Sequence, residues 1–296
     1  MREKVKMFAA VLLLMIMVPY MVTLFFHEEA AGFMEQKNQA AELEEKLLLL
    51  VSEEISGQAE VEAIKAQAVI ARTELYVNPA LTVVGNTKNL QENMEVLRFC
   101  VEETEGEILT CQGVPIDAAY HRVSAKITRN GAEVSGQEDK SYLRSVDSSM
   151  DIASSSYLTV FYMEKEELAQ KIEELLSKQE ADAELESNTG DHLPVSVNPD
   201  TILSDLIIVE RDSAQYVTKV KYETYILSGE SIRDILDLSS SAYYFSELNG
   251  KVRIMTKGLG HGLGLSQYGA EVMAKEGKTY REILKYYYTG VEITKI

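Results

Sequence analysis

The chain contains no tryptophan, two cysteines and five prolines, and it has fewer basic than acidic residues. Two cysteines are too few for a small fold held together by several disulfides. With 26% charged and 46% apolar residues, the composition also differs from that of disordered or collagen-like chains. The 29 Lys and Arg against 47 Asp and Glu give a net charge of -18, which argues against nucleic acid as a partner, because phosphate binding needs clustered cations. We expect one or two packed domains.

The N-terminus carries a long apolar run. Residues Met7 to Phe26 are 20 positions without a charge, which as a helix would span about 30 Å, the thickness of a hydrocarbon core. Basic residues precede the run, so residues 1–6 are expected in the cytoplasm and the chain from residue 27 onward outside. A cleaved secretory signal is the alternative, but the run is longer than the apolar part of such signals and lacks a small-residue cleavage site. We therefore predict a single-pass protein of the cell membrane with a linker at 27–40 and an extracytoplasmic domain at 41–296.

An extracytoplasmic location permits a disulfide between Cys100 and Cys111. A two-residue turn at Glu105 and Gly106 would place the two cysteines opposite each other on a hairpin. The alternative, which the sequence leaves open, is that both are small buried strand residues. No C-x-x-C pair is present, and the histidines are too scattered to predict a metal site, so we expect no metal and no cofactor. The four histidines are His27, His121, His192 and His261.

Helical and strand patterns alternate beyond residue 40, which predicts an α+β fold with mixed helices and antiparallel strands. Residues 42–51 and 60–76 have the apolar spacing of helices, with Ser56 as a cap for the second and Asn78-Pro79 as its stop. Short β-rich runs follow, among them Met94 to Glu102, and a later strand is expected at Lys251 to Thr256.

Residues 165–195 form an acidic insertion rich in Glu, Ala, Gln and Ser. Such a charged segment is either an arm that binds a partner or a solvated helix followed by a surface linker. The second reading is the more usual one for a run of charges.

The C-terminal stretch contains a glycine-rich loop that opens a helix. A dinucleotide-binding loop needs glycine where this chain has Leu263 or Leu265, and no Gly-Lys-Ser or Gly-Lys-Thr is present, so nucleotide binding is not supported. The loop instead interleaves glycines with hydrogen-bonding and stacking side chains, which suits a polyhydroxylated ligand such as a sugar. These side chains are His261, Ser266, Gln267 and Tyr268.

Five blocks of the sequence together carry a family signature. The most specific is GHGLGLSQYGA at 260–270. The other four are LEEKLLLLVSEEI at 43–55, VEAIKAQAVIART at 61–73, PIDAAYH at 115–121 and SYLRSVDS at 141–148. In this order, the five blocks resemble the stage II sporulation protein D and amidase-enhancer family. The resemblance covers the chain from about residue 40 to its C-terminus.

This resemblance implies a lytic transglycosylase that cleaves peptidoglycan glycan strands, preferring strands without stem peptides and leaving 1,6-anhydromuramic ends. It further implies a role in septal wall remodelling and engulfment during sporulation. The catalytic glutamate of the family, counted back from Lys65, falls on Glu54, and Glu62 is the second candidate.

The chemistry of glycosidic cleavage is compatible with a single glutamate as the catalytic residue. Glycosidic cleavage needs a carboxylic acid with a raised pKa, and a transglycosylase needs no second carboxylate because the 6-hydroxyl of the muramic residue is the nucleophile. Glu54 lies among Leu50, Val51 and Ile55, which would desolvate it and raise its pKa. Glu62 lies in the first turn of the next helix, where the helix dipole favours the ionised form. This contrast favours Glu54 as the acid.

Further residues are predicted to bind the substrate. Arg72 either binds the sugar or pairs with an acidic neighbour, and His121 and His261 either orient sugar and glutamate or are partly buried, hydrogen-bonded histidines. Tyr268 can stack on a pyranose ring. The predicted substrate-binding set is Gln67, Arg72, His121, His261, Ser266, Gln267 and Tyr268.

Two departures from the family bear on activity. The proline of the Glu-Met-Pro element is Ser56, and HRVSAKIT at 121–128 lacks the glycines of the family's His-Ser-Ser-Ser-Gly-Gly-like stretch. A chain with weakened catalysis would act as a glycan-binding activator of a cell-wall amidase, or as a structural component of the engulfment machinery. The expected partners are therefore peptidoglycan strands, a cell-wall amidase, other engulfment proteins and, through the N-terminal helix, the membrane.

Overall fold

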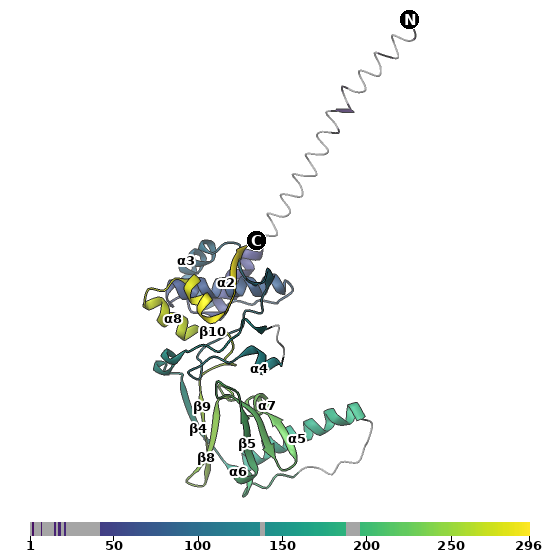
Figure 1. Cartoon of the computed structure of the whole chain (residues 1–296), viewed down its shortest axis with the longest axis vertical. Coiled ribbons are helices and arrows are strands. Elements are labelled where there is room, and N and C mark those ends of the chain that lie inside the picture. Colours follow the sequence, from purple (N-terminus) through teal and green to yellow (C-terminus); the bar gives the residue numbers. More distant parts are fainter. Residues whose placement is uncertain are drawn as a thin grey trace.

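The computed structural model describes residues 42–136, 140–187 and 196–296, with a few isolated positions before residue 42. These residues form two lobes, which Figure 1 shows one above the other. We call the described parts of 42–156 and 259–296 the helical lobe, and those of 158–257 the sheet lobe. Each lobe has its own hydrophobic core. The sheet lobe is thus an insertion between two segments of the helical lobe.

The predicted membrane span at 7–26 and the linker at 27–40 lie outside the described residues, apart from the isolated positions. Within the part of the chain that the structure does describe, no helix has the length and apolarity needed to cross a membrane.

The helical lobe is built around α2 (Val61–Val77). The alanines of α2 are buried, and their small side chains let neighbouring helices approach closely. An unlabelled helix over 42–54 precedes it and contributes Leu47 and Val51 to the same core. The other helices of this lobe are α3 (Thr87–Glu103), α4 (Gly131–Ser135), the 3-10 helix η2 (Ser149–Ala153), α8 (Gln267–Lys275) and α9 (Tyr280–Tyr287).

Two small sheets tie the end of the chain to this lobe. Strand β1 (Glu107–Cys111) pairs antiparallel with β2 (Val114–Pro115) and with the last strand, β11 (Glu292–Lys295). Strand β3 (Tyr120–His121) pairs in parallel with β10 (Leu265–Ser266). The second pairing brings the central and C-terminal motifs of the sequence side by side.

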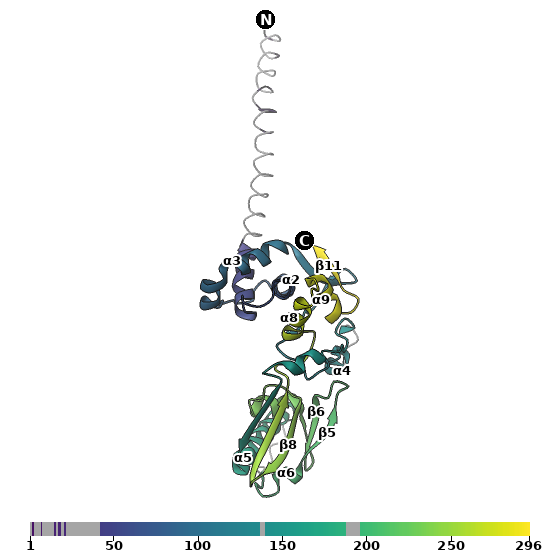
Figure 2. The same cartoon turned by 90° about the vertical axis from the view of Figure 1, so that its left-hand side faces the viewer.

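The sheet lobe contains two antiparallel three-stranded sheets, of order β4-β9-β8 and β5-β6-β7. Figure 2 shows α5 beside the first of these sheets. The strands are β4 (Leu158–Met163), β5 (Leu206–Arg211), β6 (Val217–Tyr222), β7 (Tyr225–Ser228), β8 (Tyr243–Leu248) and β9 (Lys251–Lys257). The helices are α5 (Lys165–Ser187), α6 (Ile202–Asp205) and α7 (Gly229–Ile235).

The α+β class with antiparallel sheets is confirmed, as are the end of α2 before Asn78 and the strand at β9. The strand predicted at Met94 to Glu102 is wrong, because this segment is the second half of α3. Its buried residues Leu97, Cys100 and Val101 have helical spacing. Ser56 does not cap α2, whose N-cap is Glu60.

The predicted cysteine hairpin is also wrong. Cys100 lies on α3 and Cys111 at the end of β1, and both are free thiols. Cys100 is buried, as the alternative interpretation expected, but on a helix and not on a strand.

The first part of the acidic segment, α5, packs in the sheet lobe and is not a detached arm. Leu168, Ile172 and Leu176 of α5 recur every four residues and are buried in the sheet-lobe core. Residues 188–195 lie outside the described residues.

Candidate active site

Glu54 is the last residue of the helix over 42–54. The end of this helix is held by Asn89 of α3, whose Nδ2 donates to the carbonyls of Ser52 and Ile55 at 2.8 and 2.7 Å. These bonds satisfy acceptors that a helix C-terminus leaves unpaired. The backbone on both sides of Glu54 is therefore held against α3.

Side chains from three distant segments contact Glu54. Gln67 of α2 donates from Nε2 to Oε2 of Glu54 at 2.8 Å, and Tyr120 of β3 also hydrogen bonds to the carboxyl group. Gln267, the first residue of α8, donates from Nε2 to the Glu54 carbonyl at 3.0 Å and to Oε1 of Gln67 at 3.2 Å. The fold thus gathers Gln67 and Gln267, which are 200 residues apart in the sequence, beside the predicted acid.

The pKa of the Glu54 carboxyl is raised to about 7. Burial is the largest cause, because it disfavours the charged form. Hydrogen bonds from Gln67 and Tyr120 favour the carboxylate and lower the pKa, whereas the nearby carboxylates of Glu74 and Glu53 raise it. The expectation that apolar neighbours desolvate Glu54 and raise its pKa is confirmed.

A groove in two parts runs past Glu54. The larger part, about 1190 Å³, is lined by residues of both lobes, such as Glu74 and Phe161. The smaller part, about 560 Å³, is lined by residues that include Tyr268. A polymer lying along the groove would therefore extend to both sides of the carboxyl. The residues that line both parts are Glu53, Glu54, Arg122, Leu259 and Gln267.

His121 and His261 both line the larger part of the groove, with ring centroids 5.9 Å apart. Nδ1 of His121 lies 3.0 Å from the carbonyl oxygen of Leu263, and Nδ1 of His261 accepts from the Leu263 N–H at 3.1 Å. Burial lowers the pKa of His121 to about 3 and also lowers the pKa of His261. Both imidazoles are therefore neutral at pH 7 and bring no positive charge to the groove.

The glycine-rich loop before α8 passes very close to β3. Gly264 has a φ of +66°, and a Cβ added there would lie 1.8 Å from the carbonyl oxygen of Ala119, so only glycine fits. Ser266 is buried and caps α8 by accepting from the N–H of Gly269 at 3.2 Å. Ser266 therefore starts the helix and does not line the groove, whereas the next residues, Gln267 and Tyr268, do.

Two predicted site residues lie away from the groove. Arg72 is buried and binds the Glu44 carboxylate through Nε and Nη2, at 2.8 and 3.0 Å, while Nη1 donates to Thr104. Two roles were considered for Arg72, sugar binding and pairing with an acidic neighbour. The structure shows the pairing. Glu62 accepts from the backbone N–H of Tyr280 at 2.7 Å and lines neither part of the groove.

Sequence reasoning missed Tyr120 and Glu74. Tyr120 directly precedes the predicted His121, and no periodic signal sets it apart. Glu74 is seven residues after Gln67 on α2, hence on the same face of the helix, and burial raises its pKa. The helical spacing from Gln67 was the signal that would have found Glu74.

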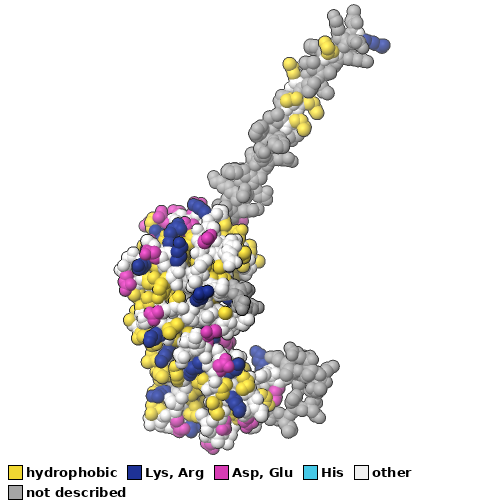
Figure 3. Space-filling model, in the orientation of Figure 1, with side chains coloured by type: hydrophobic (Ala, Val, Ile, Leu, Met, Phe, Trp, Pro, Cys, Tyr) yellow, Lys and Arg dark blue, Asp and Glu magenta, His cyan; other side chains and the backbone are white. Residues whose placement is uncertain are grey.

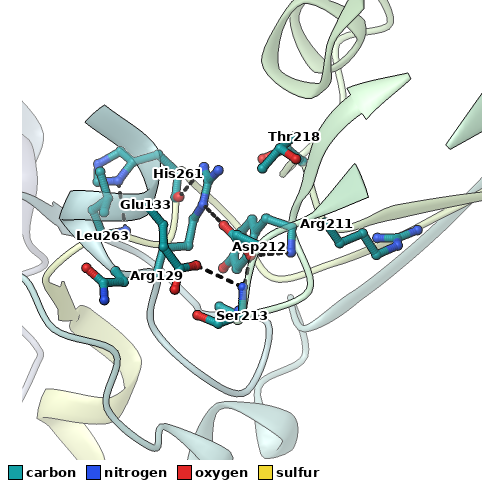
Figure 4. A network of polar contacts seen from close by, with 12 residues as sticks. Arg129, Glu133, Arg211, Asp212, Ser213, Thr218, His261 and Leu263 are labelled. Carbon is teal, nitrogen blue, oxygen red and sulfur yellow. Dashed lines mark hydrogen bonds and ion pairs between the residues drawn. The ribbon is translucent and has the colours of Figure 1, made fainter. Parts of the chain in front are cut away.

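Arg129, also missed, joins the two lobes (Figure 4). Its guanidinium binds Asp212 and Glu230 of the sheet lobe, both at 2.6 Å, and donates to the carbonyl of His261 at 3.3 Å. The same group lies over the ring of Tyr216, 4.9 Å from its centroid. This buried network fixes the sheet lobe against the loop that carries His261.

The polar groups at the groove are carboxyl, amide, phenol and imidazole groups, which act as acids, bases and hydrogen-bonding partners toward a sugar. Within the ranges that the structure describes, no three His, Cys, Asp or Glu side chains are placed to hold a metal ion. His27 and His192 lie outside these ranges.

Comparison with known proteins identifies the family. Residues 34–111, which include Glu54 and α2, match the stage II sporulation protein family. The chain is 30% identical over 279 residues to stage II sporulation protein D of Bacillus amyloliquefaciens, covering 86% of this chain and 74% of the relative. Identity to stage II sporulation protein D of Bacillus subtilis strain 168 is 30% over 287 residues, covering 87% and 77%. The chain therefore belongs to the stage II sporulation protein D family.

A second kind of relative is an amidase enhancer of Bacillus subtilis strain 168. The identity is 25% over 286 residues, which is 83% of this chain but 40% of that protein. The resemblance read from the sequence motifs is thus confirmed for both branches of the family.

Proposed function

We propose that the protein is a lytic transglycosylase that cleaves peptidoglycan glycan strands, with Glu54 as acid and base. One observation carries the proposal: the Glu54 carboxyl, with a pKa of about 7, lies where the two parts of the groove meet. A carboxyl with this pKa is partly protonated at neutral pH, as a group that protonates a leaving oxygen must be. The family resemblance implies the same activity.

Glu54 carries out both proton transfers of the reaction. First, its carboxyl gives a proton to the glycosidic oxygen while the bond from that oxygen to C1 of the muramic residue breaks. The resulting carboxylate then takes the proton from the 6-hydroxyl of the same muramic residue, while the oxygen of this hydroxyl forms a bond to C1. The products are a shortened strand and a 1,6-anhydromuramic end. No water is consumed, and Glu54 returns to its protonated form.

The groups around Glu54 have two roles: they stabilise its carboxylate and they contact the sugar. Gln67 and Tyr120 stabilise the carboxylate that forms after the first proton transfer, because they hydrogen bond to it. We assign contacts with the sugar to groove-lining residues of the predicted set, namely His121, His261, Gln267 and Tyr268. Strands without stem peptides are the proposed substrate.

A second candidate function is activation of a cell-wall amidase by a chain that binds glycan without cleaving it. The similarity to an amidase enhancer favours this candidate. The altered stretch after His121, which lines the groove through Arg122 and Val123, is where such a loss of activity would originate.

We further propose that the protein acts outside the cell membrane during engulfment in sporulation, anchored through residues 7–26. The apolar run and the basic residues before it support this orientation. Alkaline phosphatase fused after residue 296 is expected to be active in intact cells. An inactive fusion that is nevertheless produced at full length would contradict the proposed orientation.

Mass spectrometry of glycan strands incubated with the purified protein tests the activity. Native protein is expected to release anhydromuramic ends from strands without stem peptides, and Glu54→Gln to release about 10²–10⁴-fold fewer. Glu62→Gln is the matched control, because it removes the same charge from a residue away from the groove, and it is expected to keep activity. If native protein binds strands and releases nothing, the activator is the better interpretation.

A further inference from the structure

One face of the β4-β9-β8 sheet points away from the sheet-lobe core. In β9, Val252, Ile254 and Thr256 are buried, so the alternating residues between them face outward. The strand register then places the following side chains on one surface, which we call the outer face: Leu158, Val160 and Tyr162 of β4, Arg253, Met255 and Lys257 of β9, and Tyr244 and Ser246 of β8.

The outer face is apolar and open to solvent along β4. Leu158, Val160 and Tyr162 are 49%, 42% and 53% exposed, although they are large hydrophobic side chains. Single exposed hydrophobic residues are common on proteins, but three in register on one strand form a continuous patch. In Figure 3, hydrophobic and basic side chains lie together over the sheet lobe.

Three cations on or beside the outer face are not neutralised. Lys257 lies 5.1 Å and the Arg211 guanidinium 4.3 Å from the ring centroid of Tyr244, and Arg253 donates to the hydroxyl of Ser246 at 2.9 Å. Among the described residues, none of the three cations forms an ion pair with a carboxylate. In a chain with a net charge of -18, an unpaired cluster of this kind favours an anionic ligand.

The outer face continues the smaller part of the groove. Ser156 and Leu259 line that part. Leu158 lies two residues after Ser156 and Lys257 two residues before Leu259, and Leu158 and Lys257 pair at the end of the sheet. The backbone N–H of Gly258 donates to the carbonyl of Tyr157 at 2.7 Å and joins the two segments at this junction. A polymer that leaves the groove at this end therefore meets the outer face next.

We propose that the outer face binds the same glycan strand beyond the groove, by pairing its cations with the free lactyl carboxylates of muramic residues. This inference rests on the proposed function. Removal of a stem peptide frees one carboxylate on each muramic residue, so a strand without stem peptides is a polyanion. A chain of charge -18 repels such a polymer except where cations are exposed. Arg253 and Lys257, four residues apart on β9, provide positive charge over about 13 Å.

An acidic protein segment is the competing occupant, and the placement of the charges disfavours it. An extended peptide would add to the free edge of β4 through backbone hydrogen bonds. The cations instead lie on β9 and near β8, across the width of the sheet. A polymer lying across the face reaches them, whereas pairing at the β4 edge does not.

Affinity for strands without stem peptides, measured with Glu54→Gln so that no cleavage occurs, tests the proposal. We expect Arg253→Glu with Lys257→Glu to weaken binding about tenfold at low salt, because two attractions become repulsions. The matched control is Lys221→Glu with Lys285→Glu, which changes the net charge equally at exposed positions outside groove and outer face. We expect less than about a twofold effect from it. Thermal melting establishes that both double variants fold.

Two further probes identify the ligand class. Uncharged chitohexaose is expected to bind both double variants equally, because it has no carboxylates. Poly-L-glutamate is expected to bind far more weakly than the strands, and equal binding would overturn the proposal in favour of an acidic peptide. Equal affinity of the two double variants for the strands would also overturn it.

Release of anhydromuramic ends by protein with Glu54 intact separates this proposal from the proposed function. If the native protein releases these ends and charge reversal leaves strand affinity unchanged, the outer-face proposal alone fails. If charge reversal weakens binding and no ends are released, the transglycosylase proposal fails and the outer face stands.

Discussion

Gln67 and Glu54 are joined by a hydrogen bond of 2.8 Å from the amide Nε2 to the carboxylate Oε2. Because the amide donates, the bond favours the ionised carboxylate and lowers the pKa of Glu54, against the larger raising effect of burial. The other end of the amide, Oε1, accepts from Gln267, which fixes its orientation. The pKa of about 7 results from these opposing effects, which mutations can change one at a time.

Tyr120→Phe removes a hydrogen bond that lowers the pKa of Glu54. The pKa of the carboxyl should therefore rise, and the protonated form should persist to higher pH. The rate of anhydromuramic end release is expected to fall with increasing pH around pH 7 in the native protein and at higher pH in the variant. The rate on the acidic plateau should change by less than about tenfold. A shift of the profile to lower pH would show that Tyr120 does not stabilise the carboxylate.

Glu54→Gln is expected to reduce the release of anhydromuramic ends by about 10²–10⁴-fold, because the proton donor is lost. The same change should increase stability at about pH 8 by about 1 kcal/mol. The folded-state pKa of Glu54 is raised from 4.5 to about 7, so the unfolded chain loses this proton first and native stability decreases as pH rises through that interval.

Chemical unfolding at several pH values checks the stability effect of Glu54→Gln. The advantage of the variant should vanish below about pH 4, where the carboxyl is protonated in both states. Glu95→Gln, at an exposed position on α3, is the control and should show no such pH dependence. An advantage of Glu54→Gln that is equal at all pH values would mean that ionisation of Glu54 does not cost stability.

Gly269→Ala is expected to destabilise the protein by about 2 kcal/mol through overpacking. A Cβ at this position would lie 2.0 Å from the hydroxyl oxygen of Tyr287 and 2.9 Å from the Oγ of Ser148. Tyr287→Phe removes the nearer atom, so Gly269→Ala should cost less in that background. Urea unfolding of the two single variants and the double variant measures this coupling. Strict additivity would show that the clash with the hydroxyl is not the cause.

Lys126→Gly is expected to stabilise the protein by about 1 kcal/mol. Lys126 has a φ of +99°, a conformation that is strained for any residue with a side chain and that glycine adopts readily. Lys126→Ala is the control, since it removes the charged chain but keeps the strain, and it should give no gain. Thermal unfolding of the three proteins compares them, and equal gains would attribute the effect to loss of the lysine side chain.

The sequence predicted local features well where one short-range rule decided them. Pro79 cannot continue a helix, so the end of α2 was readable. The strand at β9 was readable from its alternation, because one of its faces is buried and the other is not. The segment Met94 to Glu102 was misread because short apolar runs fit a strand and a helix almost equally well.

The candidate acid could also be predicted from the sequence, but the residues that surround it in space could not. Family motifs and apolar neighbours pointed to Glu54, and its raised pKa follows from the burial of that helix end. Tyr120 and Arg129 carry no periodic or motif signal, and their roles depend on partners far away in the chain. Arg72 had two possible roles in the sequence, and the position of Glu44 decided between them.

The sequence by itself determined the family and the α+β class, and the family resemblance together with its apolar neighbours predicted Glu54 as the acid. These depend on residue types, on periodicity and on neighbours a few positions away. Only the tertiary structure decided that Gln67, Tyr120 and Gln267 meet at Glu54, and that the outer face lies at the end of the groove. The physical reason is that pKa shifts and binding surfaces arise from contacts through space, which chain separation does not reveal.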